Sequence, residues 1–202
     1  MTPREQTLTR DEILGAALAM IDAAGTDALS MRKLAGTLGV EAMTLYHHFP
    51  NKDAILDGVV ERVFAEMRIP EPLPEEWMAL AEEMFVAFRR VLVEHPNTIV
   101  LLARRPLNTE GSADFIEAPL SVLARSGLPP ERVGQLYQSL VAYAFGNAFI
   151  ASDRPIAPDG SALRTDDDRY PVARASGSAI SRFDEATFRE TLEHIMRGFG
   201  GS

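Results

Sequence analysis

The chain has 202 residues, no cysteine and a formal net charge of −9. A chain of this length buries about 70% of its unfolded surface, which is enough for one good core and a small second module. The lack of cysteine excludes disulfides and thiol catalysis. The excess of acidic over basic residues argues mildly against a nucleic-acid partner. The polar N-terminus has no apolar signal core, and no run of about 18 apolar residues occurs, so we expect a cytoplasmic protein with no membrane partner.

Residues 9–24 predict an amphipathic helix. Thr9 and Glu12 form a capping box, in which each side chain satisfies the free backbone amide of the other residue. Gly25 ends the helix.

Residues 30–49 predict two short helices joined by a tight turn, the first over 30–38 and the second over 41–49. Ser30 is a suitable N-cap, and Gly39 suits the turn because glycine adopts a left-handed conformation without a Cβ clash. The outer face of the second helix carries small side chains at its start and aromatic, hydrogen-bonding side chains further along. It has almost no charge. A recognition helix in a major groove requires such a face. An ordinary helical hairpin with a few surface aromatics fits the same pattern.

Residues 52–68 predict a further helix that connects this N-terminal module to the rest of the chain. Asn51 can cap it, and Lys52 lies beside its free amides, an arrangement suited to a phosphate. The following segment, IPEPLP, cannot be helical because proline lacks the amide donor. We expect a helix-turn-helix domain over 1–51 and a larger helical domain over 52–202.

The larger domain is also predicted to be helical, which makes the fold all-α. Its helices are expected over 75–95, 98–103, 112–126, 130–152 and 184–198. The helix over 130–152 has too many apolar positions for a one-sided helix, so we expect one face in the subunit's core and the other against a partner. With the final helix it would form a four-helix interface in a homodimer. Residues 153–178 are typical of a loop, and the acidic run at 166–168 fits a solvated loop or, alternatively, a metal site.

No catalytic motif is recognisable in the sequence. Four histidines occur, at 47, 48, 95 and 194, and none has the spacing or the nearby carboxylate pair of a zinc site. There is no nucleophile elbow, P-loop or dinucleotide fingerprint. We therefore expect no catalytic residue, no metal and no cofactor.

The segment ALSMRKLAGTLGVEAMTLYHHFPNKDAIL, residues 28–56, resembles the DNA-binding region of the tetracycline-repressor (TetR) family of transcription regulators. The resemblance implies a homodimeric regulator, expected to be a repressor, on a palindromic double-stranded operator. It assigns DNA contacts to Arg32, Ala42, Met43, Thr44, Tyr46, His47, His48 and Lys52. Tyr46 and Lys52 would hold phosphates, whereas Ala42, Met43 and His47 would meet base edges. Family members often have glutamine or proline where Ala42 and Met43 stand, so the operator sequence cannot be transferred.

The remainder of the chain resembles the C-terminal domain of the tetracycline-repressor type. The residues that match in order and spacing are Trp77, Phe88-Arg89, His95, Arg105-Pro106, Gly127 and Gly146. This resemblance implies a small-molecule effector held among the helices. The residues assigned to effector binding are Phe64, Met67, Met84, Phe88, Leu101, Arg104, Arg105, Phe115, Tyr137 and Asn147. Each apolar member of this set, taken singly, is more typical of a core residue than of a ligand contact.

The sequence departs from that type where tetracycline and its magnesium ion would be held. Those positions fall near Met67, Met84, Leu101 or Leu102, Pro119, Ala142 and Ile150, all of them apolar. A divalent cation needs oxygen or imidazole ligands, so we expect a mostly apolar or aromatic effector instead. The helix over 52–68 would transmit binding by changing the spacing of the two recognition helices. Two alternatives remain: a helical small-molecule-binding protein or enzyme that retains the helix-turn-helix, and an activator or nucleoid-like binder.

Overall fold

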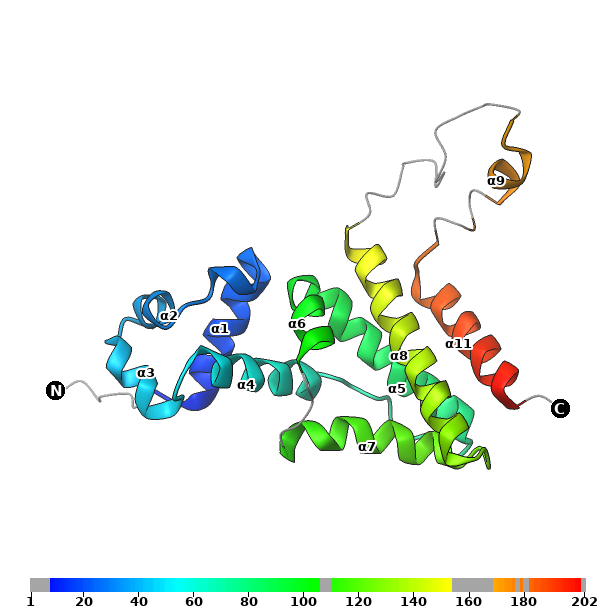
Figure 1. The fold of residues 1–202 in the computed structure, drawn as a ribbon, viewed down its shortest axis with the longest axis horizontal. Helices are drawn as coiled ribbons and strands as arrows, with labels where there is room; N and C mark the ends of the chain where they lie inside the picture. Colours follow the sequence, from blue (N-terminus) through cyan, green and yellow to red (C-terminus); the bar gives the residue numbers. More distant parts are fainter. Residues whose placement is uncertain (1–7, 106–109, 154–168, 177–178, 180–181, 201–202) are drawn as a thin grey trace. The chain divides into compact units, whose positions relative to one another are not determined.

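Every regular element that the structure describes is a helix (Figure 1). The structure is a computed structural model, and it describes residues 8–105, 110–153, 169–176, 179 and 182–200. The predicted all-α fold is therefore confirmed. The chain divides into two compact units, one made of Met1–Arg68 and Glu94–Glu117, the other of Ile69–Val93 and Ala118–Ser202.

The first unit contains the helix-turn-helix. Its elements are α1 (Arg10–Ala24), η1 (Thr26–Ala28), α2 (Met31–Leu38), α3 (Ala42–His48), α4 (Lys52–Ala65), η2 (Pro96–Thr98), α6 (Ile99–Arg104) and the start of α7 (Glu110–Ala124). The predicted caps are present: Thr9 and Glu12 form a complete capping box, and the side chains of Ser30 and Asn51 accept from the amides of Lys33 and Ala54.

The core of the first unit forms where α1 crosses α4. Ile13 and Ile21 of α1 and Val59 of α4 are fully buried. At Gly58 the two helices approach so closely that a Cβ would lie 2.7 Å from a methyl carbon of Leu14. A larger residue at position 58 would therefore have to displace the Leu14 side chain.

Ionic contacts also join α1 to α4 and to the residue just after it. Arg62 of α4 pairs with Asp11 of α1. Nδ1 of His95 lies 2.8 Å from Asp22, near the end of α1, and its Nε2 lies 2.9 Å from Glu66, just after α4. No carboxylate pair near His95 is recognisable in the sequence, because its two partners lie 73 and 29 residues away along the chain.

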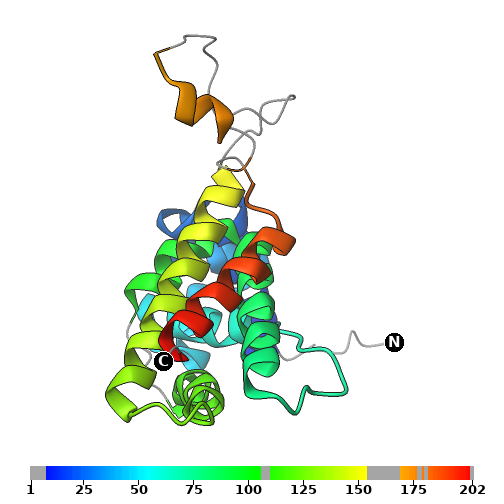
Figure 2. The same cartoon turned by 90° about the vertical axis from the view of Figure 1, so that its right-hand side faces the viewer.

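The second unit is built on α5 (Trp77–Glu94), the end of α7, α8 (Pro130–Asp153), α9 (Pro171–Ala175) and α11 (Glu185–Gly200). Helices α8 and α11 run side by side, as Figure 2 shows. Leu136, Leu140 and Leu192 are fully buried. The Asp184 side chain accepts from the Thr187 amide at 2.8 Å and so fixes the start of α11.

Two predictions differ from the structure by more than two residues. The helix expected over 52–68 ends at Ala65, where Glu66 and Met67 donate to the carbonyls of Val63 and Phe64 in a tighter turn. The proline-rich segment sets an outer limit, since Ile69, the residue before Pro70, is pushed out of the helical region. The tighter turn at Glu66 and Met67 ends the helix before that limit.

The loop expected over 153–178 is also wrong in part, because Pro171–Ala175 forms α9. Proline at the first helical position has its φ already set for a helix. Residues 154–168, with the acidic run at 166–168, lie outside the described residues.

Candidate nucleic-acid interface and effector-binding residues

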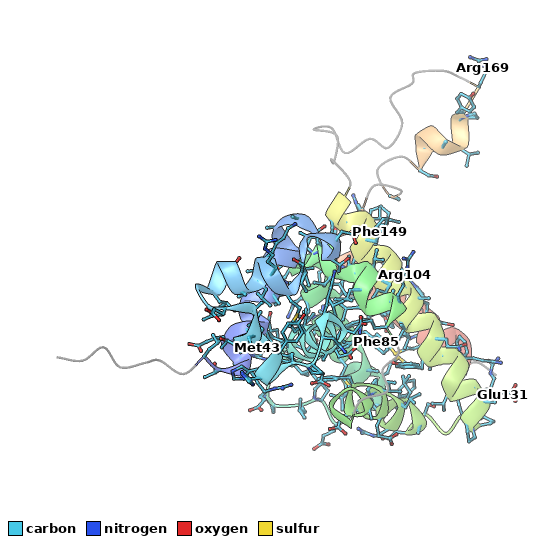
Figure 3. All side chains as sticks on the ribbon, turned by 60° about the vertical axis from the view of Figure 1, so that its left-hand side comes forward. Met43, Phe85, Arg104, Glu131, Phe149 and Arg169 are labelled. Atoms are coloured by element: carbon cyan, nitrogen blue, oxygen red, sulfur yellow. The ribbon has the colours of Figure 1, made fainter. Side chains whose placement is uncertain are left out.

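Helix α3 presents a weakly charged, hydrogen-bonding face to solvent. The side chains of Met43 and Tyr46 are 64% and 48% exposed, and His47 is also exposed (Figure 3 marks Met43). On the opposite face Leu45 is fully buried, and Phe49 just after the helix is buried as well. This distribution follows from the helical spacing of the apolar residues. The exposed face can therefore enter a groove while the buried face holds the helix in place.

The turn between α2 and α3 sets the direction of the exposed helix. Gly39 has φ 69°, the left-handed conformation expected for it. The Val40 amide donates to the Ala35 carbonyl at 3.0 Å, which closes the end of α2. Arg32 is exposed on α2, whereas Ala42 and Thr44 at the start of α3 are half-buried. The eight residues assigned to DNA contact thus all belong to one unit, although the contact itself stays a prediction.

The two ends of α3 are held differently. Glu41 precedes the helix without a side-chain hydrogen bond to it. At the other end, the guanidinium of Arg10 donates to the His48 carbonyl and lies 4.0 Å from the centroid of the Phe49 ring. Arg10 is not among the residues predicted from the sequence, and no local signal identifies it, because 38 residues separate it from His48.

Lys52 already has a protein partner. Its ammonium donates to the Thr26 carbonyl at 3.0 Å, in a half-buried position. An ammonium carries three donors, so this bond leaves two for a phosphate oxygen. The phosphate contact of Lys52 stays a prediction.

Some of the effector-binding candidates in the first unit have packing partners or ion pairs of their own. The rings of Phe64 and Phe115 stack with centroids 4.7 Å apart. Leu101 is buried, Met67 is half-buried and Arg104 is exposed.

Arg105 extends from the end of α6 to α4. Its Nε donates to Asp57 at 2.7 Å, and its terminal nitrogens lie 3.3 Å from the Asp53 carboxylate and 3.0 Å from the Asp53 carbonyl. The guanidinium is therefore engaged by one face of α4. Effector contact would require Arg105 to share or exchange these partners.

The candidates of the second unit also contact residues of that unit. Phe88 makes an edge-to-face contact with Phe145, at 5.3 Å between centroids. Asn147 is buried, and its side-chain oxygen accepts from Nε of Arg89 at 2.6 Å.

Tyr137 and Met84 complete the second set. The ring of Tyr137 lies 6.5 Å from that of Phe85, and burial raises the pKa of its hydroxyl. Met84 is half-buried. Effector binding by these residues stays a prediction, since the same contacts suit a core.

The described residues contain no metal-binding cluster and no membrane-spanning helix. Among those that the structure describes, no cluster of three or more histidines and carboxylates could hold a metal ion. The two carboxylates beside His95 contact opposite nitrogens of its ring, so the three side chains do not point toward one shared metal ion. No helix in the described ranges has the length and apolar character needed to cross a membrane.

Comparison with known proteins covers both parts of the chain. Residues 13–59 match the family described as bacterial regulatory proteins, tetR family, and residues 70–200 match the tetracycline repressor-like C-terminal domain. An HTH-type transcriptional regulator of Saccharopolyspora erythraea is 33% identical over 94% of this chain and 70% of its own length. The class D tetracycline repressor of Escherichia coli is 31% identical over 95% of this chain and 89% of its own length.

A solved structure agrees with the sequence relatives. The crystal structure of the Streptomyces coelicolor TetR family protein ActR, in complex with (S)-DNPA, superposes with a TM-score of 0.78. It is 29% identical and covers 98% of both chains. The chain therefore belongs to the tetR family of bacterial regulatory proteins and is a ligand-responsive transcriptional regulator.

Proposed function

We propose that this chain is a homodimeric repressor that binds a palindromic operator through α3 and leaves it when a mostly apolar effector binds. The observation that carries the proposal is the exposed face of α3, with Met43, Tyr46 and His47 held outward by the buried Leu45. We assign DNA binding to residues 1–51, and effector binding and dimerisation to residues 52–202, with α4 connecting the two. DNA binding would place the protein in the cytoplasm, and the proposal includes no catalytic activity.

The side chains of α3 supply the chemistry for reading a duplex. Ala42, Met43 and His47 would meet base edges or a thymine methyl in the major groove. Tyr46 and Lys52 would hold phosphates, which fixes the position of the protein without reading sequence. Thr44, Arg32 and His48 would add contacts to the same stretch of duplex.

Dimerisation is supported by the exposed face of α8. Ala142, Gly146, Phe149 and Ile150 are exposed along it at helical spacing (Figure 3 marks Phe149). The two small residues allow a second helix to approach closely, and the two large ones supply apolar area. A second copy would also double the few phosphate contacts that each subunit can make.

An apolar or aromatic effector is supported by the residue types and by the relatives. Most of the residues assigned to effector binding are apolar or aromatic, and the few polar ones could orient a ligand. ActR structures contain (S)-DNPA or actinorhodin, and other relatives are named tetracycline repressors. We do not expect tetracycline with magnesium here, because the positions near which its ligands would fall are apolar.

Induction would act through α4. Arg105, at the end of α6, binds Asp53 and Asp57 of α4, and α4 is fixed to α1 by the Arg62–Asp11 pair. An effector that displaces the end of α6 would therefore move α4 and the helices packed on it. Two recognition helices must lie about 34–36 Å apart to meet successive major grooves, so a small shift would lower operator affinity.

The test is a mobility-shift titration of the purified chain on the promoter DNA next to its own coding region. The proposal predicts binding to a two-fold symmetric site at physiological salt, and weaker binding to a single half-site. A panel of aromatic compounds should include one that releases the DNA. Equal affinity for symmetric, half-site and scrambled DNA would contradict the proposal.

A further inference from the structure

We propose that Arg10 is a positioning residue for operator recognition, because it fixes the C-terminal end of α3 to the start of α1. The inference rests on the proposed function, in which α3 reads the operator. Arg10 is not among the residues assigned to DNA contact, and its role here is to act through α3.

The first observation is the contact of Arg10 with the end of the helix backbone. The last carbonyls of an α-helix have no partner within the helix. His48 is the last residue of α3, and its carbonyl accepts a hydrogen bond from Nη1 of Arg10. A cation at this end is also favoured by the helix dipole.

The second observation is the contact of Arg10 with the residue that follows the helix. The Arg10 guanidinium carbon lies 4.0 Å from the centroid of the Phe49 ring, within the range of a cation–π contact. Phe49 is 1% exposed, and its amide donates to the Leu45 carbonyl at 2.9 Å. Arg10 thus contacts both the final carbonyl of α3 and the ring that anchors α3 in the core.

Arg10 is itself held in place by the start of α1. It is the first residue of that helix and directly follows Thr9 of the capping box. Within the box, the Thr9 amide donates to the Glu12 carboxylate at 2.7 Å, and the Glu12 amide donates to the Thr9 hydroxyl at 3.2 Å. The backbone from which Arg10 extends is therefore fixed, and this fixes the end of α3.

This placement matters because α3 is short. It has seven residues, and no side chain caps its N-terminal end. Tyr46 and His47 lie in its last turn, so fraying from the C-terminal end would move two of the residues assigned to DNA. Loss of Arg10 would therefore reduce operator binding more than non-specific binding, since non-specific binding depends mainly on charge.

The experiment compares Arg10→Gln with Arg68→Gln in the full-length protein. Arg68→Gln is a charge-matched control, because Arg68 is exposed and donates to the carbonyls of Ala65 and Met67 at the end of α4. Hydrogen exchange of the peptide covering residues 42–49 is measured without DNA. We expect exchange to be about five- to tenfold faster in Arg10→Gln. The control should match the wild-type chain.

The DNA arm separates positioning from a direct phosphate contact. Arg10→Gln should lower operator affinity about five- to tenfold and leave the salt slope unchanged, whereas loss of a phosphate contact would reduce the slope by about one. Arg10→Lys should restore part of the loss, because lysine keeps the charge but lacks the planar guanidinium.

Either of two results would overturn the inference: unchanged exchange over residues 42–49 in Arg10→Gln, or a salt slope reduced by about one. Failure of the wild-type chain to bind any palindrome would instead refute the proposed function, and it is observed before any variant is compared. The exchange measurement needs no DNA, so the two failures are distinguishable.

Discussion

Replacing His95 by glutamine tests whether a protonated imidazole holds α1 and α4 together. Its two ring nitrogens lie 2.8 Å from Asp22 and 2.9 Å from Glu66. An ionised carboxylate only accepts hydrogen bonds, and a neutral imidazole has one N–H. Both bonds therefore require the imidazolium form. Glutamine has no charge at any pH and cannot reproduce this bridge.

The expected loss of unfolding free energy depends on how far the three side chains are exposed to solvent. Hydrogen bonds between charged groups contribute about 1.5–3 kcal/mol each when shielded from water. The side chain of His95 is 14% exposed, but those of Asp22 and Glu66 are 31% and 35% exposed, so solvent screening reduces both bonds. We expect His95→Gln to lower the free energy of unfolding by about 2 kcal/mol in total.

The effect should depend on pH with a definite sign. Burial alone would lower the pKa of His95, but the hydrogen bonds to Glu66 and Asp22 outweigh it, so the pKa is raised above its ordinary value of 6.5. A raised folded-state pKa means that the stabilisation is complete below about pH 6.5 and is lost as pH rises through the folded pKa.

The assay is urea unfolding of wild type and variant from pH 5.5 to 9 at one fixed protein concentration, since dimerisation makes stability concentration-dependent. The difference in unfolding free energy should be largest at the acid end and shrink with rising pH. His47→Gln is the matched control, because His47 is exposed on α3, outside the expected dimer interface, and the assay contains no DNA; it should show no such trend. A difference that is constant with pH, or that grows towards alkaline pH, would refute the imidazolium bridge.

Three further changes test other parts of the account. Gly58→Ala should destabilise the chain by about 0–2 kcal/mol, because the cost of about 1–3 kcal/mol for displacing the Leu14 side chain is partly offset by about 1 kcal/mol of helix propensity. Gly36→Ala, in an exposed helical turn with open space, should be neutral or stabilising, and urea midpoints compare the two. Lys52→Ala should weaken binding to all DNA sequences alike and reduce the salt slope by about one, and an unchanged slope would remove Lys52 from the interface. Asn147→Ala should lower stability by about 1.5–3 kcal/mol, because Nε of Arg89 loses its acceptor, and unchanged stability in thermal unfolding would argue against that bond.

The features that could be predicted from sequence are those that depend on neighbouring residues. Helix caps were predicted at Thr9 with Glu12, at Ser30 and at Asn51. Each of these side chains bonds to a backbone amide only three residues away along the chain. Gly39 was predicted as the turn residue because only a short-range steric rule is needed. The exposed face of α3 followed from helical periodicity in the same way.

The features that could not be predicted depend on contacts between distant segments. Arg10 stands at the first position of α1, and nothing near it indicates that it reaches His48. The bridge at His95 requires the ends of α1 and α4 to meet the same residue, which only the fold establishes. Arg105 was predicted to orient an effector, but its charge gave no indication that two aspartates of α4 would bind it.

The central claim is that two copies of α3 read one palindrome at a fixed spacing. The most direct measurement is the affinity of the wild-type chain for an operator palindrome and for the same palindrome with five base pairs inserted between its halves. Half-sites read by a dimer are about 10–10.5 base pairs apart, so the insertion turns one half to the opposite side of the duplex. The account predicts that the insertion reduces affinity to the level of a single half-site, and undiminished binding to the inserted site would contradict it.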